Sequence, residues 1–172
     1  EDSKTIGLAH KLVCETIRAK NLIDYLLNSL LKPRSLSDFR LGLRAFLRLY
    51  THETQMVGHD FEKAVDMTRI GRSVLGWHEF SEVEEMLGKI LNVKLSVLLK
   101  GVSDEEKIAL TTYNPLWFVK DSFKVFGRKE ALEFLESCKE IPPTYIRLNT
   151  LKGSEEVLFK DIESDHIVLE KV

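Results

Sequence analysis

Three arginines recur at every fourth residue in the first third of the chain: Arg40, Arg44 and Arg48. On a helix this spacing aligns three guanidinium groups along one stripe. Each guanidinium is a planar fork of donors that matches a pair of phosphate oxygens. Such a stripe can follow the phosphates of an RNA backbone. The alternative interpretation is a solvated face with a few salt bridges.

Further basic residues lie near this stripe or form a second spaced pair: Lys32, Arg34, Arg69 and Arg72. Residues 20–48 contain six basic and two acidic side chains, whereas the whole chain has a net charge of −2. The positive charge is therefore local, and no global field attracts the chain to nucleic acid.

A second candidate site lies in the sequence IPPTYIRLNTLK, residues 141–152. Polar and apolar residues alternate from Thr144 to Thr150, which predicts a strand with Arg147 and Asn149 on one exposed face. A cation and an amide placed in this way could contact a phosphate and a base or ribose edge of RNA. The alternative is a hydrogen-bond network with a neighbouring domain. Residues 166–169 suggest a second short strand.

Other chemistry has little support in the sequence. The spacing of His52, Glu53, His59 and Asp60 fits no familiar metal site. Cys14 and Cys138 lie among apolar helix positions, so we expect buried thiols and no disulfide. No Ser-His-Asp arrangement is recognisable, and no apolar run approaches the roughly 18 residues of a membrane span. We expect a soluble cytoplasmic protein with no metal ion.

The elements that must position these residues are helices. Apolar residues recur with a helical period from about residue 5 to residue 112, which predicts a bundle of helices with short connections. Its first helix should turn Ile6, Ala9, Val13 and Ile17 toward the core. Two helix starts are predicted from capping patterns, Ser81 with Glu84 and Ser103 with Glu106.

A second region should begin at residue 113. Asn114 and Pro115 predict a helix start, and Gly127 is placed to end that helix. A further helix should stop before the two prolines at 142 and 143, and a short helix should follow the strand around residues 157–162. The predicted domains are residues 1–112 and 113–172.

The ordered features from Asn114 to Lys152 resemble a known family. They are Asn114-Pro115 with Trp117, Phe126-Gly127, Glu130-Ala131, the two prolines, and Arg147-Leu148-Asn149-Thr150 before a Ser-Glu-Glu helix start. The segment is similar to the one that precedes the catalytic domain in the Sun/Fmu family of RNA cytosine-C5 methyltransferases. In relatives with an N-terminal extension, that extension is similar to the antitermination factor NusB. The resemblance implies a mainly α fold, a NusB-like bundle followed by a small α/β segment with a short strand.

The resemblance also implies a function. The parent enzyme would use S-adenosylmethionine and two cysteines, whereas this chain lacks the glycine-rich cofactor loop, and neither of its cysteines follows the family's proline or threonine. We therefore expect no cofactor and no catalytic residue in this chain. It would dock structured RNA, ribosomal or transfer RNA, onto a C-terminal catalytic domain in cis or in trans, with no membrane partner. The alternative is a helical protein-protein interaction module without RNA binding.

Overall fold

The computed structural model describes residues 3–58, 61–140 and 145–164. These residues form ten α-helices and no strand, which confirms the mainly α class. The chain divides into two compact units, Glu1–Lys139 and Glu140–Val172, which are described separately.

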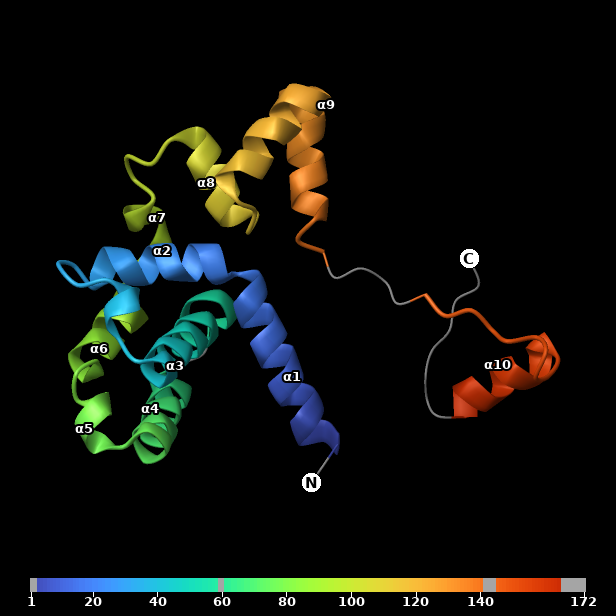
Figure 1. Ribbon diagram of the computed structural model, residues 1–172, viewed down its shortest axis with the longest axis horizontal. Helices are drawn as coiled ribbons and strands as arrows, with labels where there is room; N and C mark the ends of the chain where they lie inside the picture. Colours follow the sequence, from blue (N-terminus) through green and yellow to red (C-terminus); the bar gives the residue numbers. More distant parts are fainter. Residues whose placement is uncertain (1–2, 59–60, 141–144, 165–172) are drawn as a thin grey trace. The chain divides into compact units, whose positions relative to one another are not determined.

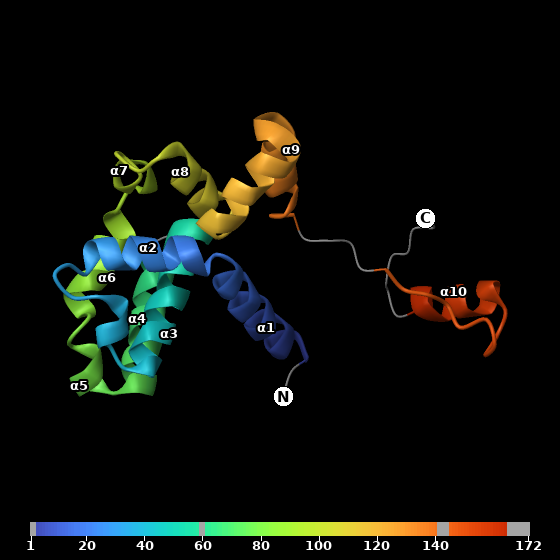
Figure 2. The ribbon, with the colours of Figure 1, turned by 45° about the horizontal axis from the view of Figure 1, so that its top comes forward.

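The first unit holds nine of the helices (Figures 1 and 2). A 3-10 turn, Leu36–Asp38, precedes α3, and a π-helical segment, His52–Val57, follows it. The helices of this unit are α1 (Ser3–Arg18), α2 (Lys20–Leu30), α3 (Leu41–Thr51), α4 (Phe61–Leu75), α5 (Trp77–Phe80), α6 (Glu84–Asn92), α7 (Leu95–Leu98), α8 (Asp104–Thr111) and α9 (Leu116–Ser137).

The main core lies between α2, α3 and α6, where α2 contacts both of the other helices. Fully burying one large apolar side chain contributes about 1.5–3 kcal/mol, so this cluster supplies most of the stability of the unit. The turn between α2 and α3 is fixed by the side chain of Asn28, whose Oδ1 accepts a hydrogen bond from the amide of Leu36 at 2.7 Å. The largest fully buried side chains of this cluster are Ile23, Leu27, Leu43, Leu47, Phe80, Val83 and Ile90.

A smaller core joins α8 to α9 around Ala109, Val119 and Leu135. Helix α9 has two arms (Figure 1), because Gly127 has a φ of 75° and interrupts the helical backbone. The predicted helix end at Gly127 is thereby confirmed. The predicted domain boundary between residues 112 and 113 falls inside this first unit, just before α9.

The two predicted capping patterns have different outcomes. The hydroxyl of Ser103 accepts a hydrogen bond from the amide of Glu106 at 3.3 Å, so the start of α8 is as predicted. The pattern of Ser81 with Glu84 is wrong, because α6 begins at Glu84 and has Val83 at its N-cap position. The Ser81 hydroxyl donates instead to the carbonyl oxygen of His78 at 2.8 Å, which closes the end of α5.

Helix α1 differs from the prediction. Its apolar residues Ile6, Val13 and Ile17 are exposed, and Thr16 is its only buried residue. The helix packs on α2 and α3 with a different side, and the residues predicted to face inward stay exposed among the described residues. Both cysteines are exposed as well, which corrects the prediction of buried thiols: Cys14 lies on α1 and Cys138 at the end of α9.

The second unit contains α10 (Glu155–Ser164), which confirms the short helix predicted there. The strand predicted from Thr144 to Thr150 is not formed in its described part, because residues 145–149 have no regular secondary structure. A strand needs a partner for its backbone groups, and the described residues of this unit offer none. The two prolines at 142 and 143 and the suggested strand at 166–169 lie outside the described residues.

Candidate nucleic-acid interface

Arg40, Arg44 and Arg48 lie on successive turns at the start and along the length of α3, but their surroundings differ. Arg48 forms a two-pronged ion pair with Asp24 of α2: its Nε donates to Oδ1 at 2.7 Å and its Nη2 to Oδ2 at 3.0 Å. Lys20 donates to the same carboxylate at 2.7 Å. Because the side chains of Arg48 and Asp24 are only about one-fifth exposed, this pair fixes α3 to α2 and is a structural contact.

The ionisation of Asp24 reflects this environment. Partial burial favours the neutral carboxyl, but the hydrogen bonds and charges of Arg48 and Lys20 outweigh that effect. The pKa of Asp24 is therefore lowered from its ordinary value. The carboxylate is charged at neutral pH and holds the guanidinium of Arg48 in place.

Arg34 pairs with Glu82 of the segment that joins α5 and α6, and Arg40 pairs with Glu79 of α5. Arg34 donates to Glu82 at 3.1 Å and stacks over the ring of Phe39 at 4.1 Å, and Arg40 donates to Glu79. The side chain of Arg40 is 79% exposed. An exposed ion pair contributes about 0–1 kcal/mol, so either guanidinium can exchange its carboxylate for a phosphate at little cost.

The two arginines of α4 also have partners. Arg72 donates to Glu84 and stacks over the ring of Trp77 at 4.8 Å, which holds α4 against α5 and α6. Arg69 pairs with Asp66 one turn earlier, at 2.9 Å, and both side chains are exposed. These contacts make Arg72 a packing residue and leave Arg69 on the surface.

The side chains of Arg44 and Lys32 have no hydrogen bond or ion pair within the described part of the chain. Arg44 is half-buried and its Nε lies out of contact with solvent, whereas Lys32 is exposed just after α2. Lys32 and Arg34 follow α2, and Arg40 and Arg44 lie at the start of α3; we call these four cations the basic edge. Glu79 and Glu82 are the two carboxylates paired with it.

The structure thus divides the predicted RNA-binding residues. The basic edge keeps Lys32, Arg34, Arg40 and Arg44, while Arg48 and Arg72 serve packing. This division could not be predicted from the spacing of the arginines, because the partner carboxylates of Arg34, Arg40, Arg48 and Arg72 lie 12 to 48 residues away.

Arg147 and Asn149 belong to the second unit and both are exposed, in line with the expectation for these side chains. The side-chain oxygen of Asn149 accepts a hydrogen bond from the amide of Leu151 at 3.2 Å, and its backbone oxygen accepts one from Lys152 at 2.9 Å. Asn149 therefore also organises the turn that leads to α10.

The four residues considered for a metal site lie in and just after the π-helical segment. His52 and Glu53 are in contact, with 3.0 Å between Nδ1 and Oε1, while His59 and Asp60 lie outside the described residues. Within the described ranges no three His, Cys, Asp or Glu side chains gather into a metal-binding group. The helices described by the structure include none that is long and apolar enough to cross a membrane.

Comparisons with protein-family models, curated proteins and solved structures find none that matches this chain. The class of the protein is therefore defined by its fold: it is a mainly α-helical protein, and it carries the basic edge described above.

Proposed function

We propose that the chain is the RNA-binding N-terminal region of an S-adenosylmethionine-dependent RNA cytosine-C5 methyltransferase that acts on ribosomal or transfer RNA in the cytoplasm. The observation that carries the proposal is the ordered set of residues from Asn114 to Lys152, which resembles the pre-catalytic segment of the Sun/Fmu family. In this proposal residues 1–112 are the NusB-like bundle and residues 113–172 begin the pre-catalytic region, and the chain itself holds no cofactor and performs no chemistry.

The basic edge is the part of the first unit that would contact RNA. Phosphate contacts fix the position of a protein on a nucleic acid and need cations that are free or easily released. Lys32 and Arg44 have no carboxylate partner in the described residues, and Arg34 and Arg40 are in exposed pairs. Arg69 is a surface cation outside this edge that could extend the contact.

In the second unit, Arg147 and Asn149 would act at the junction with the catalytic domain. We propose that residues 144–150 become a strand when that domain offers a neighbouring edge, since strand formation requires a partner. Arg147 would then face the RNA or the domain surface, and S-adenosylmethionine would bind only to that domain.

One observation favours the alternative of a protein-interaction module. Glu79 and Glu82 neutralise half of the basic edge, and a phosphate backbone must displace them. If the edge bound a partner protein, its four cations would have no special affinity for RNA.

The direct test compares matched variants in RNA binding. Lys32→Gln with Arg44→Gln removes two unpaired cations, and Lys124→Gln with Lys129→Gln removes the same charge from α9. We expect the first double variant to lose about ten-fold or more in affinity for a structured RNA, measured by fluorescence anisotropy, because each phosphate contact contributes to the binding constant. Equal losses in the two double variants would remove the basic edge from the proposal.

A further inference from the structure

Two carboxylates are paired with the basic edge, and both come from one short segment. Glu79 lies in α5, and Glu82 lies in the turn that follows this helix. The amide of Glu82 donates to the carbonyl oxygen of Glu79 at 3.4 Å, so the two residues belong to one turn. Glu79 accepts a hydrogen bond from Arg40, and Glu82 accepts one from Arg34 at 3.1 Å. This segment, residues 79–82, is called the acidic turn below.

The two arginines that pair with the acidic turn are close to each other. The guanidinium carbon of Arg34 lies 4.1 Å from the ring centroid of Phe39, and Arg40 is the next residue in the chain. A phosphate backbone that contacts one of these arginines can therefore reach the other. To do so it must take the place of both carboxylates.

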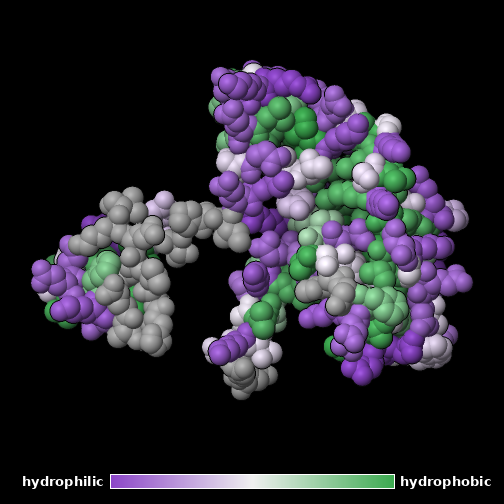
Figure 3. All heavy atoms as spheres, turned by 180° about the vertical axis from the view of Figure 1, so that it is seen from behind, coloured by the Kyte–Doolittle hydropathy of each residue, from purple (hydrophilic) through white to green (hydrophobic). Residues whose placement is uncertain are grey.

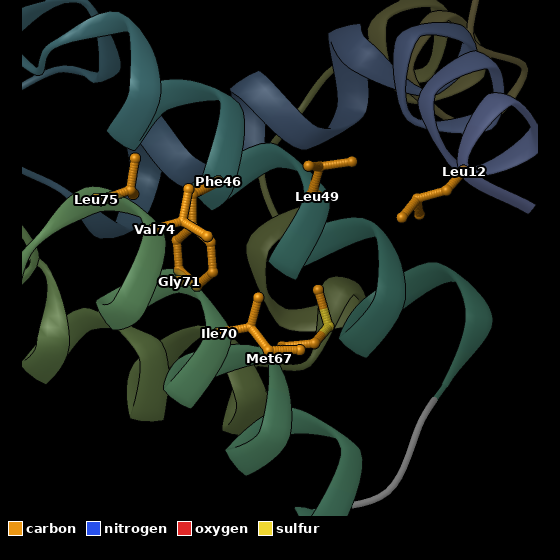
Figure 4. A pocket seen from close by; sticks show the side chains of 8 residues that line it. All are labelled: Leu12, Phe46, Leu49, Met67, Ile70, Gly71, Val74 and Leu75. Carbon is orange, nitrogen blue, oxygen red and sulfur yellow. The ribbon is translucent and has the colours of Figure 1, made fainter. Parts of the chain in front are cut away.

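Apolar contacts fix the acidic turn beside α3. Phe80, which lies between the two glutamates, is fully buried, and its ring centroid is 5.1 Å from that of Phe46 on α3. Val83, directly after the turn, is fully buried as well. Phe46 and Leu75 line an apolar groove between α1, α3 and α4 (Figure 4), where α4 packs on α3 and ends just before α5. The core therefore holds the carboxylates near the arginines without help from the ion pairs.

Local charges decide how strongly the basic edge attracts RNA. The chain has a net charge of −2, and Figure 3 shows hydrophobic surface between hydrophilic bands on the first unit. No general positive field adds to the attraction. The side chains of Arg34 and Glu82 are 47% and 50% exposed, and water weakens such a pair. Both arginines can therefore exchange a carboxylate for a phosphate.

We propose that the acidic turn is an internal competitor of RNA: it occupies Arg34 and Arg40 in the free protein and is displaced from them by a phosphate backbone. This inference rests on the proposed function, because it concerns the same basic edge. An exposed ion pair corresponds to a factor of about one to five in an equilibrium constant. Displacing two such pairs lowers the affinity for RNA by up to about 25-fold. The acidic turn thereby sets the affinity of the basic edge without changing which residues contact RNA.

RNA binding by a chain without these two acids tests the proposal. Glu79→Gln with Glu82→Gln keeps the size of both side chains and releases both arginines. We expect the full chain with these two changes to bind a structured RNA about five- to 25-fold more tightly in fluorescence anisotropy. The control Glu130→Gln with Glu133→Gln removes the same charge from α9 and should change the affinity by less than about two-fold, because salt screens distant charges.

The same comparison without the arginines separates competition from a general effect of charge. In a chain that carries Arg34→Gln and Arg40→Gln, removal of the two acids should change RNA affinity by less than about two-fold, because no guanidinium is left to release. Circular dichroism checks that every variant is folded. The proposal is overturned by an equal gain with and without the arginines, by an equal gain in the α9 control, or by no gain at all.

Failure of the proposed function has a different signature. If Lys32→Gln with Arg44→Gln weakens RNA binding but loss of Glu79 and Glu82 does not strengthen it, the basic edge binds RNA and only the competitor is disproved. If RNA binds neither to the wild-type chain nor to the chain without the two acids, both the proposed function and the competitor are disproved.

Discussion

The three arginines spaced four residues apart, Arg40, Arg44 and Arg48, have three different environments in this protein. Arg48 is locked to Asp24, Arg44 is half-buried without an ion pair in the described residues, and Arg40 extends into solvent. Burial decides what each contributes, because an ion pair that is largely removed from water leaves a costly charge behind when one partner is lost.

At this scale we predict that Arg48→Gln destabilises the fold much more than Arg40→Gln. The first change leaves the half-buried carboxylate of Asp24 with Lys20 as its remaining partner, which costs about 1–3 kcal/mol. The second removes an exposed pair and should change the free energy of unfolding by less than about 0.5 kcal/mol. Urea unfolding of both variants measures the difference, and equal losses would contradict the structural role of Arg48.

The pH dependence of stability provides a second residue-scale prediction. The pKa of Asp24 is lower in the folded chain than its ordinary value of 3.8. A lowered pKa means that the unfolded chain binds the proton more tightly, so the stabilisation is complete above the ordinary value and is lost as pH falls through the folded value.

Asp24→Asn should therefore show a shallower loss of unfolding free energy between about pH 5 and pH 2 than the wild-type chain. The variant should also be less stable at neutral pH, where the charged pair is intact in the wild type. If both proteins lose stability in parallel on acidification, Asp24 does not carry this dependence.

At the scale of helices, α3 and α4 approach each other closely at Gly71. A Cβ atom at this position would lie 2.4 Å from Cε2 of Phe46, which is half-buried against the main core. We predict that Gly71→Ala destabilises the protein by about 1–3 kcal/mol, because the ring must move within packed surroundings.

Gly88 of α6 is the matched control, since a Cβ there meets nothing within 4 Å. Gly88→Ala should stabilise the protein by about 0.5–1 kcal/mol, because alanine favours the helix. Thermal unfolding of the two variants should thus shift in opposite directions, and a shift in the same direction would contradict the close packing of α3 on α4.

Sequence patterns predicted where helices begin and end better than which segments pack against them. The break at Gly127 and the cap at Ser103 depend on residues within a few positions of each other, and both were predictable. The exposure of Ile6, Val13 and Ile17 on α1 was not, because a hydrophobic period shows which side of a helix is apolar and cannot show whether another element covers it. The strand predicted at 144–150 is absent from its described part for a similar reason, since strand pairing depends on a separate segment.

The candidate site was only half predictable. The basic residue types and their spacing were visible in the sequence, but their different degrees of exposure were not. Which arginines are neutralised depends on four acids that the fold brings to them from other segments of the chain: Asp24, Glu79, Glu82 and Glu84. The groove of α1, α3 and α4 likewise combines residues from three separate segments.

At the scale of the molecule, the stability of the described chain resides in the first unit. The buried apolar side chains of the described residues all lie between Ala19 and Leu135. We predict that a chain ending at Lys139 keeps the melting temperature of the full chain to within about 2 °C, which corresponds to less than about 1 kcal/mol. Circular dichroism melting measures this, and a large drop would show that residues after 139 complete the core.

The central claim is that the basic edge binds the phosphate backbone of RNA, and the salt dependence of affinity tests it most directly. The logarithm of the binding constant falls linearly with the logarithm of salt concentration, with a slope that counts neutralised phosphates. We predict a steep slope for the wild-type chain with a structured RNA, and a slope flatter by about one to two units for Lys32→Gln with Arg44→Gln. A slope that is unchanged in this variant, or an affinity that is independent of salt, would contradict the account.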